Sequence, residues 1–144
     1  MNGDVAILWP VLAMFVLTAC VWTYMYIVRI GYMRRERIHP QSVRSPQRKR
    51  KLIPEEINYP ADNLANLTEL PVIFYALCLL LYATGIADTT DVVAAWAFTG
   101  FRAIHSAVQC TTNRVMLRFN VYAASSLILW FLVVRTLFRL VMGT

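Results

Sequence analysis

Three polar side chains are spaced along an otherwise apolar stretch near the middle of the chain. Asp62, Asn66 and Glu69 are separated by four and three residues, so a helix places them on one stripe. Glu69 stands directly before the run "LPVIFYALCLLLYATG", where an unpaired charge at a helix centre costs at least about 2.5 kcal/mol. We therefore expect Glu69 to have a partner.

A matching stripe follows in the next apolar segment. Arg102, His105 and Gln109 are separated by three and four residues. Counted from the cytoplasmic ends assigned below, Glu69 and Arg102 both lie about 10 Å deep, and Asn66 and His105 match one turn nearer that end. The stripes predict that Glu69 and Arg102 form an ion pair, which either locks two helices together or also contacts a ligand.

Basic side chains gather where these segments reach the cytoplasm. Arg114 and Arg118 lie at the turn into the last apolar segment, with Tyr122 one turn after Arg118, and Arg34 lies at the end of the first. These residues predict a positively charged, half-buried mouth that suits a small anion with polar groups. We expect Arg114 to contact such an anion, whereas topology and lipid headgroups explain Arg34 more simply.

Four apolar segments position these residues, at 5–28, 63–84, 91–109 and 119–138. Each is close to the 20 or so residues with which a helix crosses about 30 Å of hydrocarbon. A hydrophobic content of 58% and a mean hydropathy of +0.52 exceed what a soluble domain of 144 residues needs. The sequence predicts one all-α transmembrane domain over residues 1–144, a four-helix bundle with antiparallel neighbours. Residues 29–62 are predicted to be an irregular, partly ordered strap, and Pro71 to loosen the helix around it.

The charges predict an orientation in the membrane. Nine of the 14 Lys and Arg residues lie between Arg29 and Lys51, which places that loop in the cytoplasm and both termini on the other side. Arg135 and Arg139 oppose this rule, and we expect them to snorkel to the interface. Because the net charge of +6 is accounted for by topology and anionic headgroups, we expect membrane lipids as partners and no nucleic acid.

The three cysteines do not indicate a metal site. Cys20, Cys78 and Cys110 are far apart and match no Cys-x-x-Cys or Cys/His spacing. The sequence also lacks a Gly-rich phosphate loop and a G-x-S-x-G elbow. We interpret the cysteines as packing residues.

The polar motifs together resemble the membrane-associated proteins in eicosanoid and glutathione metabolism, the MAPEG family. Three motifs in this order carry the resemblance: Asn66-x-x-Glu69 with Pro71 and Phe74 behind it, Gly100-Phe-Arg102-x-x-His105, and Asn113-Arg114. The resemblance covers all four predicted helices and is greatest to the small bacterial members. It implies a bacterial inner membrane as the location.

The resemblance also implies a homotrimer that holds glutathione between protomers near the cytosolic face. Asn66, Glu69, Arg102 and His105 match the family's motif positions, and Arg114 falls where an arginine that stabilises the glutathione thiolate is expected. Arg118, Tyr122 and Arg34 complete the expected cofactor site. The implied function is a glutathione-dependent transferase or peroxidase acting on lipophilic electrophiles or lipid hydroperoxides, small molecules that enter from the bilayer.

Two departures from the family pattern leave alternatives open. Members that bind glutathione well tend to carry an arginine just before the asparagine motif, where this chain has Asp62. They also tend to carry a tyrosine four residues after the histidine, where this chain has Gln109. An acid in place of a base weakens the binding of a tripeptide with two carboxylates. The alternatives are a non-catalytic lipid-binding or scaffold membrane protein of the same fold, and a cavity for a different hydrophilic anion.

Overall fold

The computed structural model describes residues 3–143, most of which are helical. In chain order the elements are α1 (Gly3–Ala6), α2 (Leu8–Arg35), the short 3-10 helix η1 (Pro40–Val43), α3 (Pro46–Leu52), α4 (Glu55–Leu67), α5 (Leu70–Thr84), α6 (Thr89–Cys110) and α7 (Val115–Met142). Residues 3–143 contain no β-strand. The prediction of an all-α chain is confirmed.

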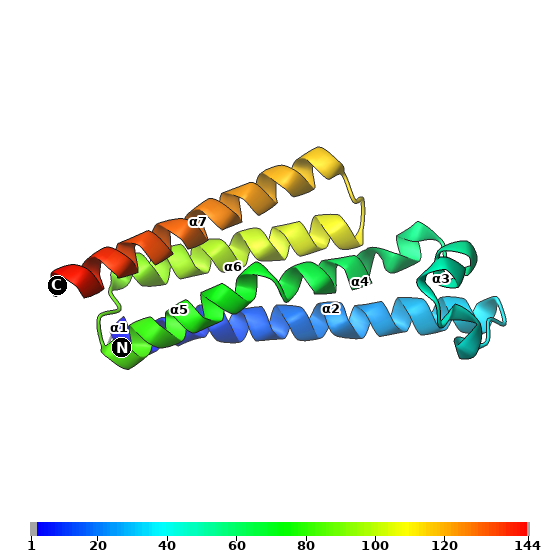
Figure 1. Cartoon of the computed structure of the whole chain (residues 1–144), viewed down its shortest axis with the longest axis horizontal. Coiled ribbons are helices and arrows are strands. Elements are labelled where there is room, and N and C mark those ends of the chain that lie inside the picture. The colour runs from blue at the N-terminus through cyan, green and yellow to red at the C-terminus, as the bar shows by residue number, and fades with distance from the viewer. Residues whose placement is uncertain (1–2, 144) are drawn as a thin grey trace.

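The long helices lie side by side and give the molecule an elongated shape (Figure 1). Helix α6 packs along α7, α2 packs along α4, and α5 continues the direction of α4. Both termini lie at one end, together with α1 and the turn between α5 and α6 (Figure 1). We call this the terminal end, and we call the other end, which carries η1 and α3, the basic end.

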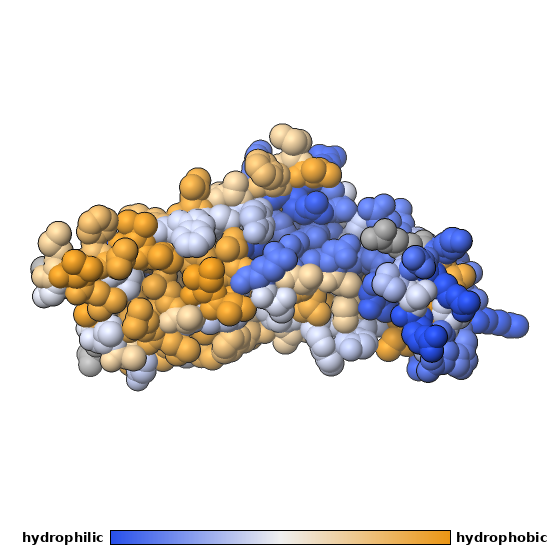
Figure 2. Space-filling model, viewed as in Figure 1, coloured by the Kyte–Doolittle hydropathy of each residue, from blue (hydrophilic) through white to orange (hydrophobic). Residues whose placement is uncertain are grey.

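The structure supports a location within a membrane. Among residues 3–143, three helical stretches are long and apolar enough to cross a bilayer: Leu8–Arg35, Glu55–Thr84 and Val115–Met142. Figure 2 shows hydrophobic side chains over the half of the molecule toward the terminal end and hydrophilic side chains at the basic end. The chain is therefore an integral membrane protein. The fourth predicted segment, 91–109, lies in α6. This helix is long enough to cross a bilayer but is not among the three sufficiently apolar stretches, because its buried face is polar.

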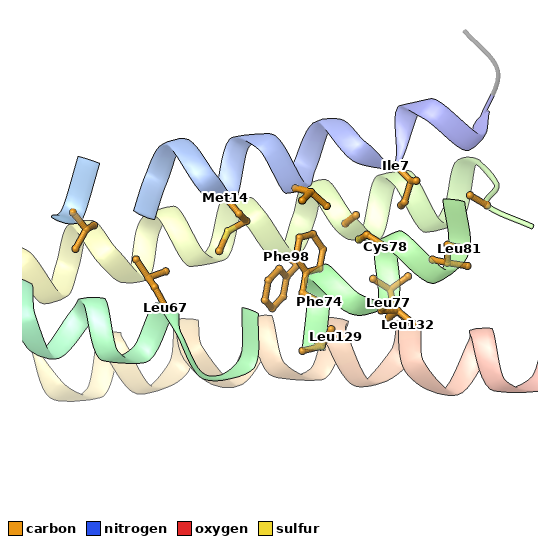
Figure 3. Packing of buried hydrophobic residues seen from close by; sticks show 14 residues of the cluster. Ile7, Met14, Leu67, Phe74, Leu77, Cys78, Leu81, Phe98, Leu129 and Leu132 are labelled. Carbon is orange, nitrogen blue, oxygen red and sulfur yellow. The ribbon is translucent and has the colours of Figure 1, made fainter. Parts of the chain in front are cut away.

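A core of apolar side chains joins α2, α5, α6 and α7 (Figure 3). Phe74 of α5 stacks on Phe98 of α6 with ring centroids 4.5 Å apart. Met14 of α2 and Leu129 of α7 are fully buried in the same cluster. Because lipid tails are as apolar as these side chains, close packing holds the helices together here. The packing fixes Phe98, one turn before Arg102 on the same helix.

The predicted helix 63–84 is two helices with a break between them. Helix α4 ends at Leu67 and α5 begins at Leu70, with Glu69 at the N-cap in a non-helical conformation (φ −95°, ψ −98°). Pro71 explains the break, because it has no N–H and its ring clashes with the carbonyl four residues earlier, that of Leu67. The Thr68 N–H donates to the Ala65 carbonyl at 3.0 Å, which satisfies part of the interrupted backbone.

The connection 29–62 is more helical than its composition predicts. Helix α2 continues through Arg35, and α3 and α4 occupy much of the remainder. Pro40 and Pro46 lie in the first turns of η1 and α3, and Pro54 is the N-cap of α4. A proline at these positions begins a helix, since the missing N–H has no partner there in any case. The other predicted limits also move outward: 91–109 becomes Thr89–Cys110, and 119–138 becomes Val115–Met142.

Candidate functional site

A polar pocket of about 520 Å³ lies between α4, α6 and α7 at the basic end. We call it the α4–α6–α7 pocket. Its lining residues come from three helices and one turn: Glu55, Asp62 and Asn66 of α4, His105 and Gln109 of α6, Asn113, and Val115, Arg118, Phe119 and Tyr122 of α7. Asn113 has a positive φ of 46°, which asparagine tolerates better than most residues. Its N–H donates to the Val108 carbonyl at 2.8 Å, which closes the turn that brings α7 back against α6.

Hydrogen bonds between side chains align α4 with α6. The Asn66 side-chain amide donates to Gln109 Oε1 at 3.0 Å. Deeper in the interface, Ser106 Oγ donates to Asn63 Oδ1 at 3.3 Å, and the Asn63 amide donates to Cys110 Sγ at 3.5 Å. The polar stripes of the two helices therefore do meet. The pairs differ from the expected ones, and sequence reasoning assigned no role to Asn63.

Arg102 is fully buried and has no hydrogen-bond partner within the described part of the chain. Its relative exposure is 0%, and Nε, Nη1 and Nη2 all lack an acceptor. The guanidinium carbon lies 4.7 Å from the centre of the Tyr122 ring and 5.4 Å from that of Phe98. Aromatic faces stabilise the cation but do not replace its hydrogen bonds. Tyr122 lines the pocket and Arg102 does not, so the cation lies behind the pocket wall.

The expected ion pair between Glu69 and Arg102 is not formed. The Arg102 nitrogens have no acceptor, and Glu69 is exposed at the break between α4 and α5. The helical spacing that places Asn66 and Asp62 on one stripe does not extend past Leu67, because the backbone leaves the helix there. The prediction was wrong for this reason, since it assumed one continuous helix.

His105 is the second buried polar group whose hydrogen-bonding capacity is unused among the described residues. It is 2% exposed, it lines the pocket, and its Nδ1 has no partner. Its ring centroid lies 5.7 Å from that of Tyr122. Because buried polar atoms in proteins are nearly always paired, an unpaired nitrogen at a pocket wall indicates a place for a ligand or water.

The predicted arginines occupy three different settings. Arg118 lines the pocket, and its Nη1 donates to Asn113 Oδ1. Arg114, at the N-cap of α7, is exposed and does not line the pocket. Arg34 is exposed in the last turn of α2, also away from the pocket lining. The structure thus brings Asn66, His105, Arg118 and Tyr122 together at the pocket, with Arg102 directly behind.

A second polar cluster lies at the terminal end and was missed by sequence reasoning. Arg135 pairs with Asp88 at 2.6 Å and with Asp91 at 2.8 Å, and Arg139 pairs with the same two acids at 3.3 and 2.9 Å. Asp88 and Asp91 also cap α6 reciprocally, each accepting the other's N–H at 3.1 Å. We call these four residues the Asp–Arg cluster. The two arginines that oppose the positive-inside rule therefore have acidic partners.

The charges of the cluster change the acidity of Asp88, which lies outside the spanning segments. Burial on its own raises the pKa of this carboxyl, but hydrogen bonds from Arg135 and the Asp91 backbone and the charges of Arg135 and Arg139 outweigh it. The pKa of Asp88 is therefore below its ordinary value. The available signal in the sequence was an acidic turn placed opposite two arginines that the topology did not explain.

Comparison with known proteins agrees with the geometry. The MAPEG family model matches residues 7–138, nearly the whole chain. We found no match among curated proteins and none among solved structures. The matched region includes the α4–α6–α7 pocket and the buried cation behind it, and on this match the chain belongs to the MAPEG family.

Proposed function

We propose that the protein is a membrane-embedded, glutathione-dependent transferase or peroxidase that acts on lipophilic electrophiles or lipid hydroperoxides. The observation that carries this proposal is the unpaired His105 nitrogen at the wall of a polar pocket, with the unpaired Arg102 cation behind it. Membership of the MAPEG family supports glutathione as the ligand. The groups that line the pocket fit such a ligand, since a peptide with carboxylates supplies acceptors for the Arg118 guanidinium and a partner for the unpaired His105 nitrogen.

Bound glutathione would supply a thiol whose thiolate attacks an electrophilic centre. A free thiol has a pKa near 8.5, and an adjacent guanidinium lowers it and raises the thiolate fraction at neutral pH. Sequence reasoning assigned this role to Arg114. Because Arg118 lines the pocket and Arg114 does not, we assign it to Arg118 and retain Arg114 as the alternative. Tyr122, on the same face of α7 one turn later, holds the Arg102 guanidinium against its ring.

We further propose that the active form is a homotrimer. Glu69 is exposed at a helix break within a stretch long and apolar enough to span the membrane. A carboxylate and an interrupted backbone facing lipid are both costly, whereas a neighbouring copy covers them. The proposal also places the basic end in the cytoplasm of a bacterium and both termini across the inner membrane. Reporter fusions to the C-terminus, one active only in the cytoplasm and one only outside it, test this orientation.

Binding of glutathione is the direct test of the proposed function. The full-length protein in lipid nanodiscs is titrated with glutathione by calorimetry, beside Arg118→Ala and Arg114→Ala variants. We expect the wild type to bind, Arg118→Ala to bind more weakly, and Arg114→Ala to resemble the wild type. The reverse order of the two variants would transfer the role to Arg114. Absence of heat at millimolar glutathione would remove the proposed function.

A non-catalytic lipid-binding or scaffold protein is the second candidate. Gln109 favours it, because its side chain is bonded to Asn66 within the pocket wall and so is less free to contact a ligand. The acids of the pocket wall favour it too, since they repel a ligand's carboxylates. This candidate predicts that a phospholipid co-purifies with the protein and that no thiol is consumed with any electrophile. Mass spectrometry of the purified protein and a thiol-consumption assay separate the two functions.

A further inference from the structure

The α4–α6–α7 pocket has walls of opposite charge. Asp62 and Glu55 line it from α4, and Arg118 lines it from α7. The two acids are seven residues apart, two helical turns, which explains why both point to the same side of α4. A ligand between these walls meets carboxylates on one side and a guanidinium on the other.

Asp62 and Glu55 of α4 have no structural role that the described contacts show. Both are exposed in the described structure, and neither forms an ion pair or side-chain hydrogen bond there. They also border a neighbouring pocket that contains Lys49. Burial and the charge of Arg29 lower the pKa of Lys49 while Asp62 acts in the opposite sense, yet Lys49 and Asp62 form no ion pair. The carboxylates of both acids are therefore available to a charged group of a ligand.

His105 supplies an independent indication that the same pocket takes a ligand. Its Nδ1 is buried and unpaired among the described residues, and His105 lines the same pocket as the acids of α4 and the arginine of α7. A ligand with carboxylates alone would bring one of them near Asp62, where like charges repel. A ligand with an ammonium group and a carboxylate pairs with both walls.

We infer that Asp62, assisted by Glu55, makes the pocket selective for a zwitterionic ligand that carries a protonated amine and a carboxylate. This inference rests on the proposed function and specifies its ligand: the ammonium of the γ-glutamyl residue of glutathione lies toward the acids of α4, and the anionic groups of the ligand lie toward Arg118. It also explains how an acid is compatible with glutathione at a position where a base is expected. Asp62 is thus a specificity-determining residue.

The test compares glutathione with its glutaryl analogue, which lacks only the amino group. Both ligands are titrated at pH 7 into the full-length wild type, Asp62→Asn, Glu55→Gln and the control Glu56→Gln in nanodiscs. Glu56 lies beside Glu55 on α4 and is exposed but does not line the pocket, so the control removes one acid away from the pocket. Melting temperatures of the unliganded variants establish that each is folded.

We expect the wild type and Glu56→Gln to bind glutathione about five- to tenfold more tightly than the glutaryl analogue, as charge-assisted hydrogen bonds at a partly exposed site suggest. In Asp62→Asn this ratio falls toward one, and in Glu55→Gln it falls by a smaller factor. Equal binding of the two ligands by the wild type, or an unchanged ratio in Asp62→Asn, would overturn the inference and leave the proposed function intact. Failure of every variant to bind glutathione would overturn both.

Discussion

The two ends of the α6–α7 hairpin differ in whether their buried charges are paired. At the terminal end, Asp88 and Asp91 pair with Arg135 and Arg139, and Asp91 is buried with all of its contacts made inside the chain. At the basic end, Arg102 is equally buried and has no acceptor among the described residues. A buried charge persists when pairing stabilises it or when function requires it. We therefore interpret the charges of the terminal end as structural and the buried charge of the basic end as part of a binding site.

The comparison also separates two kinds of cost. Removing one acid of the Asp–Arg cluster takes a charge-assisted contact away from each of the two arginines and leaves each with a single acidic partner. Removing Arg102 takes away a cation that lies against aromatic rings and has no hydrogen-bond acceptor among the described residues. Mutations at the two ends should therefore change stability in opposite directions, and the following predictions are arranged by the size of that change.

Asp91→Asn should cause the largest loss of stability. It keeps the shape of the side chain but removes a fully buried carboxylate that both Arg135 and Arg139 contact. Because Arg135 and Arg139 both keep Asp88 as a partner, the loss is that of one buried, charge-assisted acceptor, about 2 kcal/mol. The free energy of unfolding, measured by titrating a denaturing detergent into mixed micelles, should fall by that amount, while the control Glu56→Gln should not change it. A loss below about 1 kcal/mol would show that the cluster does not hold the hairpin together.

Arg102→Met should have the opposite sign in the unliganded protein. Replacing an unpaired buried cation with an apolar side chain of similar length is expected to be neutral or to stabilise by about 1 kcal/mol. Binding of glutathione should nevertheless weaken about tenfold, because the Tyr122 ring loses the cation that it rests on beside the pocket. The same detergent titration and calorimetry measure the two effects. A strong loss of stability with unchanged binding would assign Arg102 a structural role.

The sequence predicted the helices better than their interruption. Runs of apolar residues and their lengths indicated the membrane-spanning helices, and helical spacing placed Asn66 and His105 at one pocket. The same spacing failed for Glu69, because the helix that carries Asn66 ends at Leu67 and Pro71 prevents it from continuing. Helical periodicity holds only within one helix. Whether a proline kinks, breaks or begins a helix depends on its tertiary surroundings, which composition does not describe.

The charges at the terminal end were predicted as signals of orientation and not as partners of one another. The turn before α6 is acidic, and Arg135 and Arg139 were expected to reach the interface by snorkelling. Their pairing depends on α7 returning along α6 over its full length, so that residues more than 40 positions apart become neighbours. Arg114 and Arg118 were similarly indistinguishable by charge. Only the position of α7 shows which of them borders the pocket.

Acid should weaken the terminal end in a specific range of pH. The folded-state pKa of Asp88 lies below its ordinary value of 3.8, so its contribution to stability is present above that pH and is lost as pH falls through the lower folded value. The difference in melting temperature between the wild type and Asp88→Asn should stay constant from about pH 7 to pH 5 and shrink below about pH 4. A difference that is unchanged at pH 3 would contradict the pairing of Asp88 with the arginines.

Gln109→Leu should have the smallest effect on stability and is the sharpest test of the pocket wall. The variant removes one hydrogen bond to Asn66, and bonds of this kind between membrane helices average about 0.6 kcal/mol. The Asn66 amide then becomes free to donate to a ligand, so the binding of glutathione should be unchanged or stronger despite the small loss of stability. Calorimetry and detergent titration on this variant and on Asn66→Leu separate the possibilities, since Asn66→Leu loses the same bond and also the donor. If Gln109→Leu weakens binding as much as Asn66→Leu does, the Asn66–Gln109 pair itself contacts the ligand, and the pocket at the basic end is already arranged for it without rearrangement.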